Sequence, residues 1–316
     1  MQKNEILLEP WIIHHGILFG FGNLYVYDNG SDLASIKDIL LRYAKLGVNV
    51  IWDCNKTEDF KNKGDIFAAL IKKIQNEKSY DYFFPLDCDE FVMLSGENGF
   101  TSSKSEIDTY LDEHIGDDCV RAVNYQLINI PGKLDTFALI DFAKSVIPNR
   151  PLRYLDHGFH EAALASGAPA VKSRLVYAHL HNKPFPILLQ SARQKLSPFI
   201  DCDDKEAIRD YSGNGFHLTK YFLEPESRYH MAYERSTRIH CDDLLRIFDT
   251  FRLWEFMRLW GMEMNDATAE YKTASCKVEG LYNRTSYLRK NPDVAESGMD
   301  PLVHYCMFGF REGRPV

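Results

Sequence analysis

An apolar segment that ends in acidic residues is the feature that most constrains the fold. Residues 80–92 read YDYFFPLDCDEFV, so that Asp87, Asp89 and Glu90 follow directly on an apolar run. The run predicts a buried strand, and side chains two apart on a strand share a face. We therefore expect Asp87 and Asp89 to project together and Glu90 to point the other way. Such a carboxylate pair suits Mg²⁺ or Mn²⁺, whose coordination is usually completed by water and substrate phosphates, so a diphosphate substrate is expected.

Strand and helix patterns alternate through the first part of the chain. Strands are expected at residues 24–27, 48–53 and 82–86, with helices at 36–46 and 66–74. This alternation predicts an α/β fold with a Rossmann-like, mostly parallel sheet and helices on both faces. Ligands of such sheets bind beyond the carboxyl ends of the strands, where Asp28 and residues 87–90 would border one crevice.

The second half of the chain is more helical. Strands are expected at residues 119–130, before a Pro131-Gly132 turn, and at 174–181. Helical periodicity dominates from 186 to 264, with the strongest helix expected at 242–260. The apolar face of this helix is predicted to pack in the core or at a contact between subunits, which leaves a homo-oligomer open. It consists of Leu245, Phe248, Phe251, Trp254 and Leu259.

Charge and composition narrow the class of partner. The 316 residues carry a net charge of −8, which argues against a nucleic-acid binder. The seven cysteines have neither CxxC nor zinc-ligand spacing, and we expect reduced thiols in a cytoplasmic protein. No apolar run reaches the length of a membrane span, so any association with the inner face of a membrane would be peripheral.

Three motifs follow one another along the chain: KNE at 3–5 with EPWIIHH at 9–15, YVYDNGSD at 25–32, and DCDEF at 87–91. Together they resemble GT-A fold glycosyltransferases, in particular the bacterial family-two-like and family-ninety-two-like enzymes. Two departures are the missing threonine in the DNGSD loop and the short segment before Asn4, where the family has an apolar strand. The resemblance covers roughly the first 200 residues.

The resemblance implies a metal-dependent transfer of a sugar, with inversion, in the synthesis of bacterial cell-surface polysaccharides. The donor is a nucleotide sugar, with a UDP-sugar favoured, and the acceptor is a saccharide, a lipid-linked saccharide or another hydroxyl compound. Mn²⁺ or Mg²⁺ would stabilise the charge on the leaving diphosphate.

The implied site residues fall into three groups. Glu5, Asp28, Asn29 and Asp87 would bind the nucleotide, although an Asx turn is the alternative for Asp28. Asp87, Asp89 and His179 would bind the metal, where His179 shares a strand face with His181. For the base that takes the acceptor proton we expect Glu161, then Asp156 and His160, with an ordinary hydrogen-bonding loop as the alternative.

The expected domains are a GT-A catalytic domain at 1–200, a helical extension at 201–275, and a C-terminal helical module at 276–316. The last resembles a short module found beside bacterial polysaccharide enzymes. Two other functions stay open: a metal-dependent nucleotidyltransferase or phosphohydrolase, and a non-catalytic saccharide-binding protein on the same fold. Neither GxxxxGK[ST] nor GxGxxG occurs, so phosphate would be held chiefly through the metal.

Overall fold

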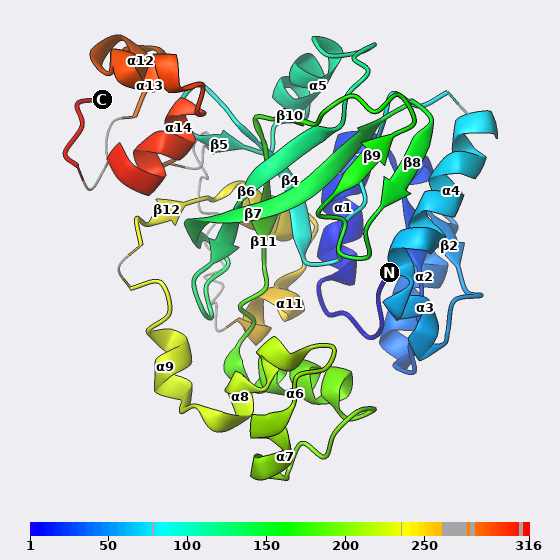
Figure 1. The fold of residues 1–316 in the computed structure, drawn as a ribbon. Helices are drawn as coiled ribbons and strands as arrows, with labels where there is room; N and C mark the ends of the chain where they lie inside the picture. Colours follow the sequence, from blue (N-terminus) through cyan, green and yellow to red (C-terminus); the bar gives the residue numbers. More distant parts are fainter. Residues whose placement is uncertain (78, 235, 261–276, 279–281, 310–311) are drawn as a thin grey trace.

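The computed structural model describes residues 1–77, 79–234, 236–260, 277–278, 282–309 and 312–316 (Figure 1). The strands are β1 (Tyr25–Tyr27), β2 (Asn49–Ile51), β3 (Tyr82–Phe83), β4 (Glu90–Ser95), β5 (Phe100–Thr101), β6 (Arg121–Asn129), β7 (Thr136–Pro148), β8 (Leu152–Leu155), β9 (Ala162–Leu164), β10 (Val171–Lys172), β11 (Leu175–His179), β12 (Ile239–His240) and β13 (Lys277–Val278). The helices are α1 (Leu8–Phe19), α2 (Ala34–Ala44), α3 (Thr57–Lys61), α4 (Lys63–Glu77), α5 (Lys104–Asp112), α6 (Phe185–Leu196), α7 (Lys205–Asp210), α8 (Lys220–Leu223), α9 (Glu226–His230), α10 (Asp243–Thr250), α11 (Trp254–Leu259), α12 (Arg284–Lys290), α13 (Pro292–Ser297) and α14 (Pro301–His304), with short turns η1 (Phe21–Asn23), η2 (Phe216–Leu218) and η3 (Tyr305–Gly309). The chain is a mixed α/β protein, which confirms the coarse fold class.

The main sheet is mixed rather than mostly parallel. Its strand order is β13-β12-β7-β6-β11-β4-β5, with β10 beside β6 and β3 beside β7. β11 runs parallel to β6, whereas the pairings of β6 with β7, of β7 with β12, and of β4 with β11 and with β5 are antiparallel. The expectation of a mostly parallel sheet is therefore wrong. Residues 130–135 connect β6 to β7 as a hairpin around Pro131-Gly132, and so short a connection can join only antiparallel strands.

A small parallel sheet of β1 and β2 stands beside the main sheet. Gln2 extends it: its N–H donates to the Tyr27 carbonyl at 2.9 Å, and its carbonyl accepts from the Asn29 N–H at 2.7 Å. The N-terminal segment thus adds a single parallel bridge, between Gln2 and Asp28, to this small sheet. It sets Glu5 close behind the carboxyl end of β1.

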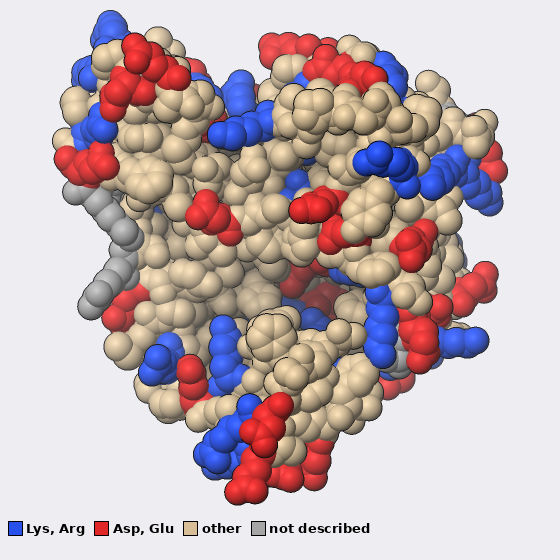
Figure 2. Space-filling model, viewed as in Figure 1, with Lys and Arg blue, Asp and Glu red and all other residues tan. Residues whose placement is uncertain are grey.

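Helices α6 to α9 form a lobe that lies below the main sheet in the view of Figure 1. The lobe has its own apolar cluster, which includes Leu188, Leu196, Tyr221 and Tyr229. Figure 2 shows that the molecule is hollowed between this lobe and the body above it.

The helix expected at 242–260 is two helices, α10 and α11. After α10, Arg252 adopts a positive φ of 55°, its N–H donates to the Asp249 carbonyl, and the Leu253 N–H donates to the Phe248 carbonyl. These bonds form a Schellman motif, which ends a helix. The expected apolar face is correspondingly broken: Leu245 and Phe248 are buried, but Phe251 and Leu259 are exposed.

The C-terminal helices α12 to α14 dock on the end of β4. Arg284 pairs with Asp300 at 2.7 Å, and Asp300 also accepts from the Ser95 hydroxyl at 2.8 Å. Tyr287 and Leu302 belong to the same apolar cluster as Phe91 of β4. The helices therefore share the main core, while the proposed domain boundaries stay predictions.

Two further sequence expectations concern the membrane and the cysteines. None of the helices in the described part of the chain has the length and apolar character of a membrane span. Cys54, Cys88, Cys119, Cys202 and Cys306 are free, but Cys241 is disulfide-bonded, so the expectation that all thiols are reduced is wrong at Cys241.

Two consecutive histidines of the EPWIIHH motif bind the open edge of β4. His14 Nε2 donates to the Val92 carbonyl at 2.9 Å, and the Val92 N–H donates to His15 Nε2 at 3.3 Å. His15 Nδ1 in turn donates to the Trp11 carbonyl. β5 pairs with β4 only at Leu94 and Ser95, so the two imidazoles satisfy backbone groups that a neighbouring strand would otherwise bind. Both histidines are fully buried and neutral: burial lowers the pKa of His14 to about 4 and that of His15 well below 6.5.

This arrangement predicts acid sensitivity. An unfolded imidazole titrates near 6.5 and folded His14 near 4, so the unfolded state binds more protons between these values and stability falls as pH falls. The titration of His14 alone lowers the free energy of unfolding by about 3 kcal/mol once the pH is below 4. In urea titrations between pH 7.5 and 4.5, we expect H14Q to flatten the pH dependence of the unfolding free energy. The exposed His230 supplies the control, H230Q, and equal pH profiles for H14Q and the wild type would contradict the prediction.

Candidate metal centre and adjoining cavity

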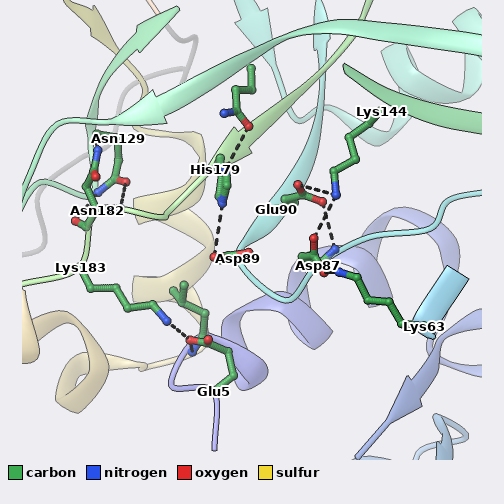
Figure 3. Close-up of polar contacts among 12 residues, drawn as sticks. Glu5, Lys63, Asp87, Asp89, Glu90, Asn129, Lys144, His179, Asn182 and Lys183 are labelled. Atoms are coloured by element: carbon green, nitrogen blue, oxygen red, sulfur yellow. Dashed lines mark hydrogen bonds and ion pairs between the residues drawn. The ribbon is translucent and has the colours of Figure 1, made fainter. Parts of the chain in front are cut away.

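The acidic motif forms a turn between two strands, not the end of one strand. β3 ends at Phe83, and β4 begins at Glu90, whose N–H donates to the Asp87 carbonyl at 3.1 Å. Pro85 lies between the two strands and has no N–H to offer a ladder, which favours the early end of β3. The expectation that Asp87 and Asp89 share one strand face is therefore wrong, and the turn sends the two side chains in different directions (Figure 3).

Asp87 points to two lysines. One carboxylate oxygen lies 2.5 Å from Lys63 Nζ, and the other lies 3.0 Å from Lys144 Nζ. Lys144 also pairs with Glu90 at 3.0 Å, and both of these side chains are 1% exposed. Burial opposes charge on Asp87, but Lys144 and Lys63 outweigh it and hold the pKa of Asp87 far below its usual range. The two carboxylates likewise outweigh burial at Lys144 and raise its pKa.

Phe159 covers this buried ion cluster. Its ring centroid lies 4.5 Å from Lys63 Nζ and 5.2 Å from Lys144 Nζ, as in cation–π contacts. Phe159 is fully buried and has a φ of 62°, which is unusual for a bulky residue. The lysine pair is thus connected to the loop that contains the predicted base residues.

Asp89 points the other way, to His179. Asp89 Oδ2 and His179 Nε2 are 3.3 Å apart, while His179 Nδ1 donates to Gln126 Oε1 at 2.8 Å. Burial opposes charge on His179, but Asp89 outweighs it and raises the pKa of His179. When His179 is neutral, the bond to Gln126 leaves the Nε2 lone pair facing a carboxylate. A cation between the two groups removes this repulsion. In metal-binding histidines, the ring nitrogen that does not bind the metal typically donates to an acceptor, as His179 Nδ1 does to Gln126.

His181 completes a group that fits a metal ion. Ligand atoms of Asp89, His179 and His181 all lie within 4.8 Å of one another. Burial and the neighbouring His179 lower the pKa of His181 to about 3, so its imidazole is neutral, as ligation requires. Two imidazoles and one carboxylate suit Mn²⁺ and other transition ions better than Mg²⁺, which prefers oxygen ligands. Asp89 and His179 were predicted as ligands; Asp87 lies outside this triad.

The segment that carries His181 is firmly anchored. Asn182 and Asn129 exchange hydrogen bonds, the shortest from Asn182 Nδ2 to the Asn129 carbonyl at 2.6 Å. Lys183 is buried and pairs with Glu5 at 2.5 Å (Figure 3). This ion pair joins the segment after β11 to the N-terminal segment beside β1.

Asp28 and Asn29 organise the loop after β1. The Asp28 carboxylate accepts from Gln2 Nε2 and the Ser31 hydroxyl, both at 2.6 Å, and from the Ser31 N–H. Asn29 Nδ2 donates to the carbonyls of Cys54 and Lys56. The Asp28 side chain therefore holds its loop through a backbone bond three residues on, whereas an Asx turn would need a bond two residues on. Nucleotide contacts of Glu5, Asp28 and Asn29 stay predictions.

The three predicted base residues lie in the loop after β8. The Asp156 carboxylate accepts from the N–H groups of Gly158 and Glu161, so it holds the loop together. The His160 ring packs against Phe142, which in turn packs against His179, at centroid distances of 5.3 and 6.0 Å. Glu161 is exposed. None of the three belongs to the candidate metal triad Asp89, His179 and His181.

A cavity of about 960 Å³ adjoins the triad. His179, His181 and Phe142 lie on its sheet side, and helices α8 and α9 supply the opposite wall. Glu224, between these helices, is the one carboxylate among the described residues that line it. Sequence reasoning had placed no substrate pocket here, because its walls come from segments about 100 residues apart.

Sequence reasoning also missed Lys63, Lys144 and Gln126. Lys144 could have been predicted, since it lies inside the strand-like run AKSVIP at 143–148 and a buried lysine requires an acidic partner. Neither Lys63 nor Gln126 stands out from its neighbours in the sequence.

No protein-family model matches the chain, and a search of curated proteins finds no similar sequence.

The geometry predicts different roles for the two aspartates of the motif. We expect D89N to weaken Mn²⁺ binding more than about 100-fold, since loss of a group that only orients a ligand already costs about 10–100-fold. D87N should keep Mn²⁺ affinity within about tenfold, yet destabilise the protein by about 3 kcal/mol because Lys144 loses a buried partner. Mn²⁺ titrations followed by electron paramagnetic resonance, with urea unfolding, measure both effects. Equal losses of Mn²⁺ affinity would instead make Asp87 a ligand.

Proposed function

We propose that the protein is a metal-dependent glycosyltransferase of the GT-A type that transfers a sugar from a nucleotide-sugar donor to a hydroxyl acceptor. The observation that carries the proposal is the triad Asp89, His179 and His181 at the edge of a substrate-sized cavity. The likeness of three sequence motifs to this class supports the reaction type and favours a UDP-sugar donor and bacterial polysaccharide synthesis at the cytoplasmic side of the membrane.

Asp89, His179 and His181 are the residues that would hold the metal, with Mn²⁺ preferred. A divalent ion there supplies positive charge for the diphosphate that leaves when the sugar is transferred. Gln126 fixes the tautomer of His179 through its Nδ1–H bond. Lys183, on the anchored segment after β11, adds a positive group next to Glu5 and orients that carboxylate.

The donor nucleotide is proposed to lie on the side of β1. The loop at Asp28 follows the carboxyl end of this strand, and Glu5 is tied to the same place because its N–H donates to Oε1 of Gln2, which bridges Asp28. Ligands of α/β sheets bind at this end. Asp87 and the two lysines adjoin the same turn as Asp89. In this proposal Asp87 faces the donor ribose rather than the metal.

The position of the base separates two candidates. Glu161 is the sequence prediction, but Glu224 lines the cavity together with His179 and His181. Its ion pair with Arg228 is loose, at 3.5 Å between exposed groups, so the carboxylate is available to a ligand. We therefore favour Glu224 as the group that takes the acceptor proton.

Binding of the nucleoside diphosphate that the donor would release tests the proposal most directly. Calorimetric titration of UDP, GDP and ADP should show binding of UDP that depends on Mn²⁺ and disappears in D89N. Failure of all three nucleotides to bind with Mn²⁺ would sink the proposal. A nucleotidyltransferase or phosphohydrolase would release different products, and a purely saccharide-binding protein would show no turnover of a UDP-sugar.

Substitution of the two carboxylates tests the base. A general base contributes about 10²–10⁴-fold, so E224Q should lower kcat by at least about 100-fold while Mn²⁺-dependent UDP binding stays intact. E161Q is the matched control and should change kcat less than about tenfold. The reverse ranking would restore Glu161 as the base.

A further inference from the structure

The outer wall of the 960 Å³ cavity combines aromatic rings with positive charge. Helices α8 and α9 contribute Lys220, Tyr221, Arg228 and Tyr229 to this wall. Lys220 Nζ lies 5.0 Å from the ring centroid of Tyr221, and the Tyr229 hydroxyl donates to the Lys183 carbonyl at 2.6 Å. The wall is thus fixed to the segment that carries His181, while its two cationic groups stay exposed to the cavity.

The charge of this wall is opposite to that of the chain as a whole. Among the described lining residues, two cationic side chains, Lys220 and Arg228, face a single carboxylate, Glu224, so positive groups outnumber negative ones on this wall. Lys195 adds positive charge near the same cavity. The pKa of His217, which lines the cavity, is lowered first by burial and then by the charges of Lys195 and Lys220. A chain of net charge −8 therefore has a locally positive cavity.

The inner wall is mostly apolar. Ile128, Ile140 and Phe142 project from β6 and β7, and Phe185 completes this surface at the start of α6. Apolar and aromatic walls suit the flat faces of sugar rings, whereas the cationic edge suits an anion. A neutral oligosaccharide would leave Lys220 and Arg228 without a complementary group.

We propose that this cavity binds the acceptor and that the acceptor is an anionic saccharide, one that carries a carboxylate or a phosphate group. The assignment to the acceptor rests on the proposed glycosyltransferase function, and the anionic class rests on the cavity itself. The nucleotide-side residues Glu5 and Asp28 do not line the cavity, whereas His179 and His181 do. The acceptor therefore approaches the metal from the side opposite the nucleotide, next to Glu224.

Three probes of defined chemistry test the anionic class. Trigalacturonate carries carboxylates, mannose 1-phosphate carries a phosphate, and maltotriose is neutral. Calorimetric titrations with Mn²⁺ and UDP present should show at least one anionic probe binding about tenfold or more tighter than maltotriose. Binding of trigalacturonate would indicate a uronic-acid acceptor, and binding of mannose 1-phosphate would indicate a phosphorylated acceptor. Equal affinity for maltotriose, or no binding of either anionic probe, overturns the proposal.

Charge reversals locate the site. K220E and R228E should each weaken binding of the anionic probe about tenfold or more, while K205E, an exposed reversal in α7 outside the cavity lining, should not. Mn²⁺-dependent UDP binding should be unchanged in all three variants. If K220E and R228E weaken UDP binding as well, the cavity holds the donor diphosphate and the acceptor assignment is wrong. If anionic probes bind but UDP never does, the glycosyltransferase proposal fails while anionic-saccharide binding stands.

Discussion

The position of β11 between β4 and β6 is the constraint on which the candidate site depends. Its antiparallel register with β4 pairs His179 with Glu90, and its parallel register with β6 places His179 next to Ile128 and within reach of Gln126. Asp89 precedes Glu90 and accepts the next backbone bond, from the Leu180 N–H at 2.8 Å. A slip of one residue would turn His179 to the opposite face and replace it with an apolar side chain. Ligand atoms of Asp89, His179 and His181 therefore come within 4.8 Å of one another only in this register.

The buried ion cluster decides which acids remain available to a metal. Removing charges from water costs several kcal/mol per ion, and the cluster offsets this only because Asp87 and Glu90 share Lys144 while Lys63 binds Asp87 as well. Such a cluster contributes little net stability, but the loss of one member is costly. Asp87 is thus held by lysines, and Asp89 is left as the carboxylate that faces the imidazoles.

Local patterns predicted the elements that depend on local chemistry. The strands expected near residues 24–27, 48–53, 119–130 and 174–181 are present as β1, β2, β6 and β11. The prediction of one helix at 242–260 was wrong, because no side-chain pattern in the sequence indicates the positive φ of Arg252. The prediction of mostly parallel strands was wrong, because an alternation of strand and helix patterns does not distinguish a crossover connection from a hairpin. Pro131-Gly132 nevertheless indicated a short connection between two of the strands. For the site, Asp89 and His179 could be predicted from motif and strand period, whereas Lys63, Gln126 and the α8–α9 wall could not.

By itself, the sequence determined that acids follow an apolar segment, that His179 lies on a strand, and that the chain is α/β. These are properties of neighbouring residues, and periodicity of two or of 3.6 reports them directly. Only the tertiary structure decided that Asp87 pairs with lysines, that Asp89 meets His179 and His181, and that a positive cavity opens beside them. Each of these depends on contacts between segments tens to more than a hundred residues apart. Strand order and register set such contacts, and neither can be read from a single stretch of sequence.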